Sequence, residues 1–473
     1  MLKYNIKYEW LLLIRNKWVQ VLTILLLILF GFAVYNGQNK VKKRKDNIAN
    51  VLLEQKEKDN EALKILDSIE KGLDVVPSNK RLTTPIVVGN IRPRTVNMPS
   101  KPTAFVSTGQ SDLFAHYVQP TVTGDDSSLN FKEMTSPVQL LFGSFDLAFV
   151  IVYLLPLIII AFSFNILASE RESGSLKLLA SQPISIRVWV LQKLGLRFLW
   201  LFLTIVVTLT IVFIVFNFDF KTSTMSLIEL LTIIIAYSLF WFVLAFATNI
   251  WIKSSAKNAI TLLGFWILFV LLSPSIINQI NNALHPVPSR TLMLNEIRTL
   301  KAEAAKKQDE ILDNFLRDHP EYAINDSTQT IGFYHRYMAA KQLVEDQLEP
   351  LTSQFESQIE NQHKFVSTSS WFSPALIVQN SFNQIAGTST KDYQDFKNQS
   401  LAFSKEWRDY FIPLLYNNSV FTKSDYQNLP KFEFSYETSN TYTKTLGLLI
   451  LSGLILLVVL IPKPNKHKVE LIS

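Results

Sequence analysis

Six stretches of the chain are apolar over roughly 20 residues, the length that crosses a hydrocarbon core about 30 Å thick. They predict spans at 18–36, 145–168, 194–216, 227–250, 259–280 and 445–462, the third to fifth of which lie within 194–280. Two long polar segments, 37–144 and 281–444, predict large insertions outside the membrane. The short segment 169–193 predicts a loop, and 463–473 a tail.

Residues 1–17 combine charged and aromatic side chains, which suit an interfacial helix in the headgroup region ahead of the first span. A cleavable signal peptide is the alternative interpretation. It is less favoured because the apolar run from Trp18 to Phe32 exceeds a usual signal core, and the sequence after it lacks a small-residue cleavage pattern.

The first insertion predicts a helix followed by extended structure. Its charged start carries apolar residues at helical spacing, although a solvated spacer is the alternative. The residues are Ile48, Leu52, Leu63, Leu66, Ile69 and Leu73. Five prolines then favour extended or edge-strand structure, because proline interrupts helices and sheet ladders. They are Pro77, Pro85, Pro93, Pro99 and Pro102.

The second insertion is predicted to be mainly helical. Val344, Leu348, Leu351, Phe355 and Ile359 follow one another at three- and four-residue steps, so they share one helix face. Pro350 within this run either kinks the helix or begins a new one. Each insertion adjoins a span, so movement of the spans can reach both directly.

Composition supports a membrane protein with large water-facing parts. The 473 residues are 48% hydrophobic with a mean hydropathy of +0.18, too apolar for a typical soluble enzyme and too polar for bare spans. The absence of cysteine excludes disulfides and thiolate zinc sites. We therefore predict an all-α integral membrane protein with six transmembrane helices and two extracytoplasmic insertions, mainly helical with some extended structure in the first.

Lys and Arg cluster on one predicted side of the membrane, which sets the orientation. Both termini and the loop 169–193 are basic and should be cytoplasmic. The basic run 40–45 lies on the other side, but it opens a long segment, and long translocated segments follow the rule less strictly. The net charge of +7 fits these basic flanks better than nucleic-acid binding, for which there is no motif.

Catalytic and metal-binding patterns are missing from the sequence. There is no phosphate-binding G-x-x-x-x-G-K-[ST] loop, no H-E-x-x-H pair, and no G-x-S-x-G turn around Ser111. The scattered histidines are His116, His285, His319, His335, His363 and His467. Asp146 and Glu229 lie only near span ends, which argues against an ion-coupled secondary transporter.

Four segments together resemble one branch of the type-2 ATP-binding-cassette (ABC) permeases. They are FDLAFVIVYLLPL in the second span, ERESGSLKLLASQPIS from Glu170 to Ser185, WFSPALIVQNSFNQIAGTSTKDYQDF from Trp371 to Phe396, and GQSDLFAHY from Gly109 to Tyr117. That branch has two large extracytoplasmic insertions and a poorly characterised C-terminal domain. The resemblance implies a multi-pass protein of the plasma membrane, here the inner membrane of a bacterium.

The resemblance also implies partners. ATP and Mg²⁺ would bind a separate cytoplasmic ABC ATPase, and a second copy or a related permease would complete a dimer in the bilayer. The segment after the second span would dock on that ATPase. Its residues are Glu170, Arg171, Glu172, Ser173, Gly174, Ser175 and Leu176. The first three place charges at a helix end, Gly174 permits a tight turn, and Leu176 with Leu178 and Leu179 would enter an apolar groove of the partner. An ordinary charged loop is the alternative.

Pro156 within the second span is a candidate hinge, because proline removes a backbone hydrogen bond; a static kink is the alternative. The leading functional hypothesis is transport, as export or extraction, of an undefined substrate by a non-catalytic permease subunit. One alternative is mechanotransmission of ATPase motion to the extracytoplasmic domains without transport. Another is a membrane-anchored receptor or scaffold that needs no ATPase.

Overall fold

A computed structural model describes residues 2–73, 75–109, 111, 114–124, 145–176, 185–215, 220–286, 290–320, 332–436 and 441–461. These parts are mainly helical and contain six helices long and apolar enough to cross a membrane. They are Lys17–Glu70, Leu147–Glu172, Ile186–Val215, Thr224–Trp251, Ser255–Leu284 and Tyr442–Leu460. The result agrees with the predicted helical membrane protein. The predicted tail 463–473 and residues 177–184 of the predicted loop lie outside the described residues.

The apolar end of the molecule is a helix bundle. Its elements are α1 (Leu2–Arg15), α2 (Lys17–Glu70), α5 (Leu147–Phe149), the π-helical η3 (Val150–Leu154), α6 (Leu155–Ser163), α7 (Ala168–Glu172), α9 (Ile186–Val215), α10 (Phe220–Trp251), α11 (Ser255–Trp266), the π-helical η4 (Ile267–Leu272), α12 (Ser273–Leu284) and α19 (Tyr442–Leu460). Helix α10 lies at the centre, where Tyr237, Phe240, Trp241 and Phe246 are almost fully buried. It packs against α6, α9, α11 and α19.

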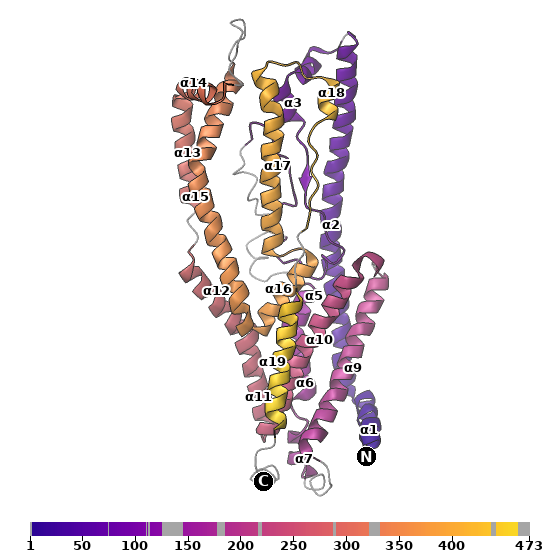
Figure 1. The fold of residues 1–473 in the computed structure, drawn as a ribbon. Helices are drawn as coiled ribbons and strands as arrows, with labels where there is room; N and C mark the ends of the chain where they lie inside the picture. The colour runs from indigo at the N-terminus through magenta and orange to yellow at the C-terminus, as the bar shows by residue number, and fades with distance from the viewer. Residues whose placement is uncertain are drawn as a thin grey trace.

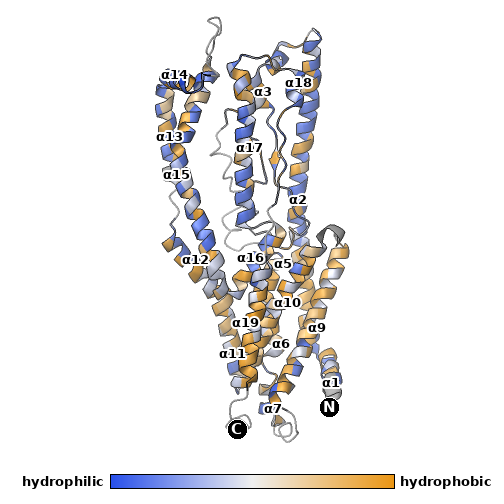
Figure 2. Cartoon of the chain, viewed as in Figure 1, coloured by the Kyte–Doolittle hydropathy of each residue, from blue (hydrophilic) through white to orange (hydrophobic). Residues whose placement is uncertain are grey.

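The polar end is built from both insertions (Figure 1). Its elements are the 3₁₀-helical η1 (Pro77–Thr83), α3 (Pro85–Ile91), β1 (Val96–Asn97), β2 (Tyr117–Val118), α13 (Arg290–Lys306), α14 (Gln308–Asp318), α15 (Phe333–Ser369), the 3₁₀-helical η6 (Ser370–Phe372), α16 (Pro374–Ala386), α17 (Thr390–Tyr416) and α18 (Lys423–Gln427). Figure 2 shows hydrophilic residues along α13, α15 and α17 and hydrophobic ones along α9, α11 and α19.

Helix α2 joins the two ends without interruption. Its 54 residues extend about 80 Å at 1.5 Å per residue, from the bundle to the far side of the polar end (Figure 1). The predicted helix beyond residue 36 is confirmed. At the other end Asn16 separates α2 from α1, and its Oδ1 accepts a hydrogen bond from the Trp18 N–H at 3.0 Å. The interfacial segment is therefore a separate helix.

The prolines act differently in the two insertions. Pro77 and Pro85 begin η1 and α3 instead of extended segments, because the first turn of a helix needs no proline N–H. Among the described residues the strands are β1 and β2, which pair antiparallel with Val96 opposite Val118. Pro350 lies inside α15, which continues from Phe333 to Ser369. The third span begins earlier than predicted, since Ile186 already starts α9.

The two insertions pack into one body. Trp407 of α17 is fully buried and donates its indole N–H to the Gly89 carbonyl at 3.1 Å. Gly89 leaves no space for a Cβ, which would lie 2.3 Å from Val122. At the far end, Lys423 Nζ lies 2.7 Å from Asp67 Oδ1 of α2. Segments more than 300 residues apart thus share a core.

Candidate functional site

The second span is broken just before the predicted coupling segment, and two asparagines bond the freed backbone. Asn249 Nδ2 donates to the Ser163 carbonyl at 2.8 Å, and its Oδ1 accepts from the Leu167 N–H at 3.2 Å. Asn258 of α11 donates to the Phe164 carbonyl. Both asparagines are fully buried. Sequence reasoning missed them, although polar residues within an apolar span are a usable signal.

Glu172, at the end of α7, caps a different helix. Its Oε1 accepts the Ser255 N–H at 2.9 Å and its Oε2 accepts the Ser255 hydroxyl at 2.9 Å. Ser255 is the first residue of α11. A carboxylate is favoured there because the helix dipole places partial positive charge at the N-terminus. Glu172 therefore joins the second span to the start of the fifth.

Glu170 belongs to a charge network with α1 and α9. Its Oε1 lies 3.3 Å from Lys193 Nζ. Lys193 Nζ is also 3.5 Å from Glu9 Oε2, and Glu9 Oε1 is 3.4 Å from Arg197 Nη2. Glu9 is 3% exposed, so its carboxylate contacts these two cations away from water. The network balances two acids with two bases and holds α7 against the bundle.

The residues after α7 fold back on the chain. Ser175 Oγ donates to the Glu170 carbonyl at 3.1 Å, and Gly174 adopts a φ of +77°, which other residues rarely adopt. Leu176 is 3% exposed and belongs to the apolar core of this chain. The apolar contact that we predicted for a partner is therefore made internally by Leu176. Leu178 and Leu179 lie outside the described residues.

The exposed residues of α7 and of the turn after it are polar or small. Ser169, Glu172, Ser173 and Gly174 are exposed, whereas Arg171 is half-buried. Helix α7 lies at the same extremity of the molecule as α1 (Figure 1). Of the predicted segment, Ser173 and Gly174 thus offer a surface beside the preceding residue Ser169, while Glu170 and Glu172 bond within the chain.

Pro156 lies two residues after the π-helical η3 of the second span. Proline lacks the N–H that would bond the carbonyl four residues earlier, that of Val152. Tyr237 of α10 supplies the donor, with its hydroxyl 2.9 Å from the Val152 oxygen. The Trp266 indole N–H likewise donates to the Tyr153 carbonyl at 3.1 Å. The irregular segment is thus bonded to two neighbouring spans.

The fifth span repeats this arrangement. The π-helical η4 precedes Pro274, and its Phe269 carbonyl accepts the Ser373 hydroxyl at 2.8 Å. Ser373 also caps α16, since its Oγ accepts the Leu376 N–H at 3.3 Å. A helix of the second insertion is therefore attached directly to the irregular part of a span. π-Helical turns inserted into α-helices occur frequently at functional sites.

The start of the second span is tied to both insertions. Asp146 Oδ2 accepts the Thr108 N–H at 2.8 Å, and its Oδ1 accepts the Phe149 N–H at 2.9 Å, which caps the span. Next to Thr108, the Ser107 hydroxyl donates to Asn383 Oδ1 of α16 at 2.6 Å. Segment 101–108 thus bridges the second span and α16.

The surroundings of the second span thus consist of helix caps, an ion network and hydrogen-bonded irregular helices. In the described part of the chain, no group of three or more His, Asp or Glu side chains is arranged to hold a metal ion.

Residues 290–435 match a protein family described as a domain of unknown function (DUF3526). The match begins at the first residue of α13 and ends beyond α18, so it covers the second insertion without the spans. No curated protein and no solved structure matches the chain.

Proposed function

We propose that the chain is the permease subunit of an ATP-driven ABC transporter, with ATP and Mg²⁺ bound by a separate cytoplasmic ATPase. The observation that supports this most is the attachment of the second span at both ends. Near α7, Glu170 and Glu172 connect it to α9 and α11. At its start, Asp146 connects it to Thr108. Movement of α7 can therefore be transmitted along the second span, through these hydrogen bonds and ion pairs, to the polar end.

In this proposal the two glutamates orient α7, and the ATPase contacts the exposed residues Ser169, Ser173 and Gly174. Both carboxylates have partners within the chain, which is why we assign them to orienting α7. The α7 end is cytoplasmic and the polar end extracytoplasmic, in the inner membrane of a bacterium. The assembly is a dimer with a second copy or a related permease, and it exports or extracts an undefined substrate.

The test is association with the ATPase. The wild-type chain, expressed with a candidate ABC ATPase, should co-purify with it, and the complex should hydrolyse ATP. Ser169→Arg adds bulk and charge to α7 without removing a side-chain contact of Glu170 or Glu172. It should weaken association at least about tenfold, which corresponds to roughly 1.4 kcal/mol.

Ser353→Arg is the matched control, since Ser353 is also exposed but lies on α15 in the polar end. It should leave association unchanged. Full association of the Ser169→Arg variant would contradict the proposed contact surface. Stable purification without any ATPase, from cells that express it, would instead support the receptor or scaffold hypothesis.

Mechanotransmission is the second candidate, and α2 favours it. A continuous helix attached to α18 through Asp67 and Lys423 can convey movement of the bundle to the far end of the molecule. The distance between spin labels at Lys58 and Ser353, on α2 and α15, distinguishes the two functions. Mechanotransmission expects that distance to change during ATP hydrolysis in vesicles across which no substrate moves.

A further inference from the structure

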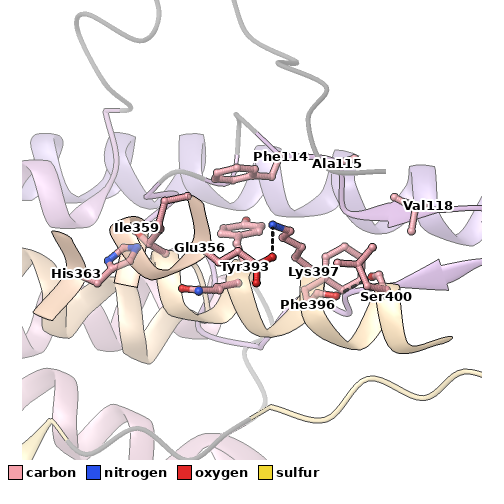
Figure 3. Close-up of a pocket in the computed structure, with 13 residues that line it drawn as sticks. Phe114, Ala115, Val118, Glu356, Ile359, His363, Tyr393, Phe396, Lys397 and Ser400 are labelled. Carbon is pink, nitrogen blue, oxygen red and sulfur yellow. Dashed lines mark hydrogen bonds and ion pairs between the residues drawn. The ribbon is translucent and has the colours of Figure 1, made fainter. Parts of the chain in front are cut away.

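A cavity of about 160 Å³ lies in the polar end between α15 and α17, beside segment 114–118 (Figure 3). Most of its lining is apolar and comes from both insertions. The cavity is far from α7, so it has no part in the coupling arrangement (Figure 1). A concave, mostly apolar cavity with a few polar groups is typical of a small-molecule site.

Aromatic side chains form much of the wall. The rings of Phe114 and Tyr393 are stacked, with centroids 4.8 Å apart and planes inclined by 29°. Phe396 and Ile359 also line the cavity, from α17 and α15. Aromatic walls favour an aromatic guest, because offset and edge-on ring contacts add to the gain from burying apolar area.

An ion pair forms part of the cavity lining. Lys397 Nζ of α17 lies 3.1 Å from Glu356 Oε1 of α15 (Figure 3). The two side chains are 22% and 42% exposed, so they reach water while bordering the apolar wall. Burial lowers the pKa of His363, which also lines the cavity, so its ring is neutral near pH 7. A positively charged substituent of a ligand can bond Glu356, and a negatively charged one can bond Lys397.

The volume limits what can enter. A cavity of about 150 Å³ holds one benzene molecule, so this one accommodates a single ring. We propose that the cavity binds a small molecule consisting of one aromatic ring with a polar substituent. The ring contacts Phe114, Tyr393 and Phe396, and the substituent bonds Glu356 or Lys397. The inference is independent of the coupling function.

The experiment measures binding of three probes to the full-length protein in lipid nanodiscs by ¹⁹F NMR. The probes are 4-fluorobenzylamine, 4-fluorobenzoate and 4-fluorobenzyl alcohol, which share a ring and differ in charge. Saturable binding to the wild type is expected. Ile359→Trp places an indole in the cavity and should weaken binding of every probe at least about tenfold. Ser353→Trp, on the exposed side of the same helix, should bind the probes like the wild type.

Two milder substitutions test the charged residues of the site. Lys397→Met leaves Glu356 as the charged group and should shift the preference toward the amine, whereas Glu356→Gln should shift it toward the benzoate. Opposite shifts cannot arise from a general loss of folding. The proposal is overturned if no probe binds saturably to the wild type, if Ile359→Trp binds as well as Ser353→Trp, or if both charge variants leave the preference unchanged.

Discussion

The carboxylate of Glu172 stabilises a helix that begins 83 residues later in the chain. Glu172→Ala removes both acceptors at the start of α11 and should destabilise the protein by about 1 kcal/mol, the usual cost of a lost helix cap. Glu172→Gln keeps one acceptor oxygen and should lose less. Thermal unfolding in detergent measures both, and Glu303→Ala on the exposed surface of α13 is the control. Equal unfolding temperatures for Glu172→Ala and Glu303→Ala would refute the capping role.

His116 makes the polar end sensitive to acid. Burial, and secondarily the nearby Arg44 charge, lower its pKa from 6.5 to about 3. Between these values the unfolded chain binds a proton that the folded chain does not, so the free energy of unfolding falls as the pH drops from 6.5 toward 3. His116→Phe removes this contribution. The unfolding temperature of the variant should therefore decline less than that of the wild type between pH 7 and pH 4, and parallel declines would exclude the effect.

At the residue scale, the sequence located the charged segment but not its partners. Glu170 and Glu172 were recognisable as charges at a helix end, which fits a protein partner as well as an internal one. Their contacts, Lys193 and Ser255, lie on other spans and are brought near only by the packing of the bundle. Leu176 was equally ambiguous, because an apolar side chain in a loop fits either a partner's groove or the chain's own core.

The second span is held in its irregular shape by Tyr237, which can be tested by a double-mutant cycle. Tyr237→Phe leaves the buried Val152 carbonyl without its donor and should destabilise the protein by about 1 kcal/mol or more. Pro156→Ala restores a backbone N–H that can bond the same carbonyl. The double variant should therefore unfold at a higher temperature than Tyr237→Phe alone. Additive losses would mean that proline and tyrosine act independently.

The sequence marks Pro156 but gives little warning of the π-helical segments. An apolar run has the same sequence pattern whether its backbone hydrogen bonds join residues four or five apart. No polar position in it reveals the change in helical periodicity. Pro274 was not singled out, although it stands in the same relation to η4 as Pro156 does to the region of η3. The donors Tyr237 and Ser373 become recognisable only once α10 and α16 are placed.

The orientation of the whole molecule can be tested because the chain contains no cysteine. Ser173→Cys and Ser353→Cys introduce thiols at exposed positions, the first directly after α7 and the second on α15 of the polar end. With α7 in the cytoplasm, a membrane-impermeant thiol reagent should label the Ser353 variant on intact cells and the Ser173 variant only after permeabilisation. The reverse pattern would invert the proposed topology, and labelling of both on intact cells would place both ends outside.

At the scale of the molecule, hydropathy alone predicted the number of candidate spans, because a bilayer imposes a length on each. It could not predict how the insertions meet. The contacts of Asp67 with Lys423 and of Trp407 with Gly89 join residues more than 300 positions apart, and their pairing depends on shape rather than on a local pattern.

Helix α2 can also convey rotation. Each residue of an α-helix turns the chain by about 100°, so one residue inserted near Gln38 would swing Arg44, Ala62 and Leu66 away from the surfaces that bury them. Seven inserted residues would return those side chains to within about 20° of their original direction while lifting them by about 10 Å. Rotation of α2 about its axis inside the bundle would therefore redirect its side chains at the far end of the molecule without moving them along the axis.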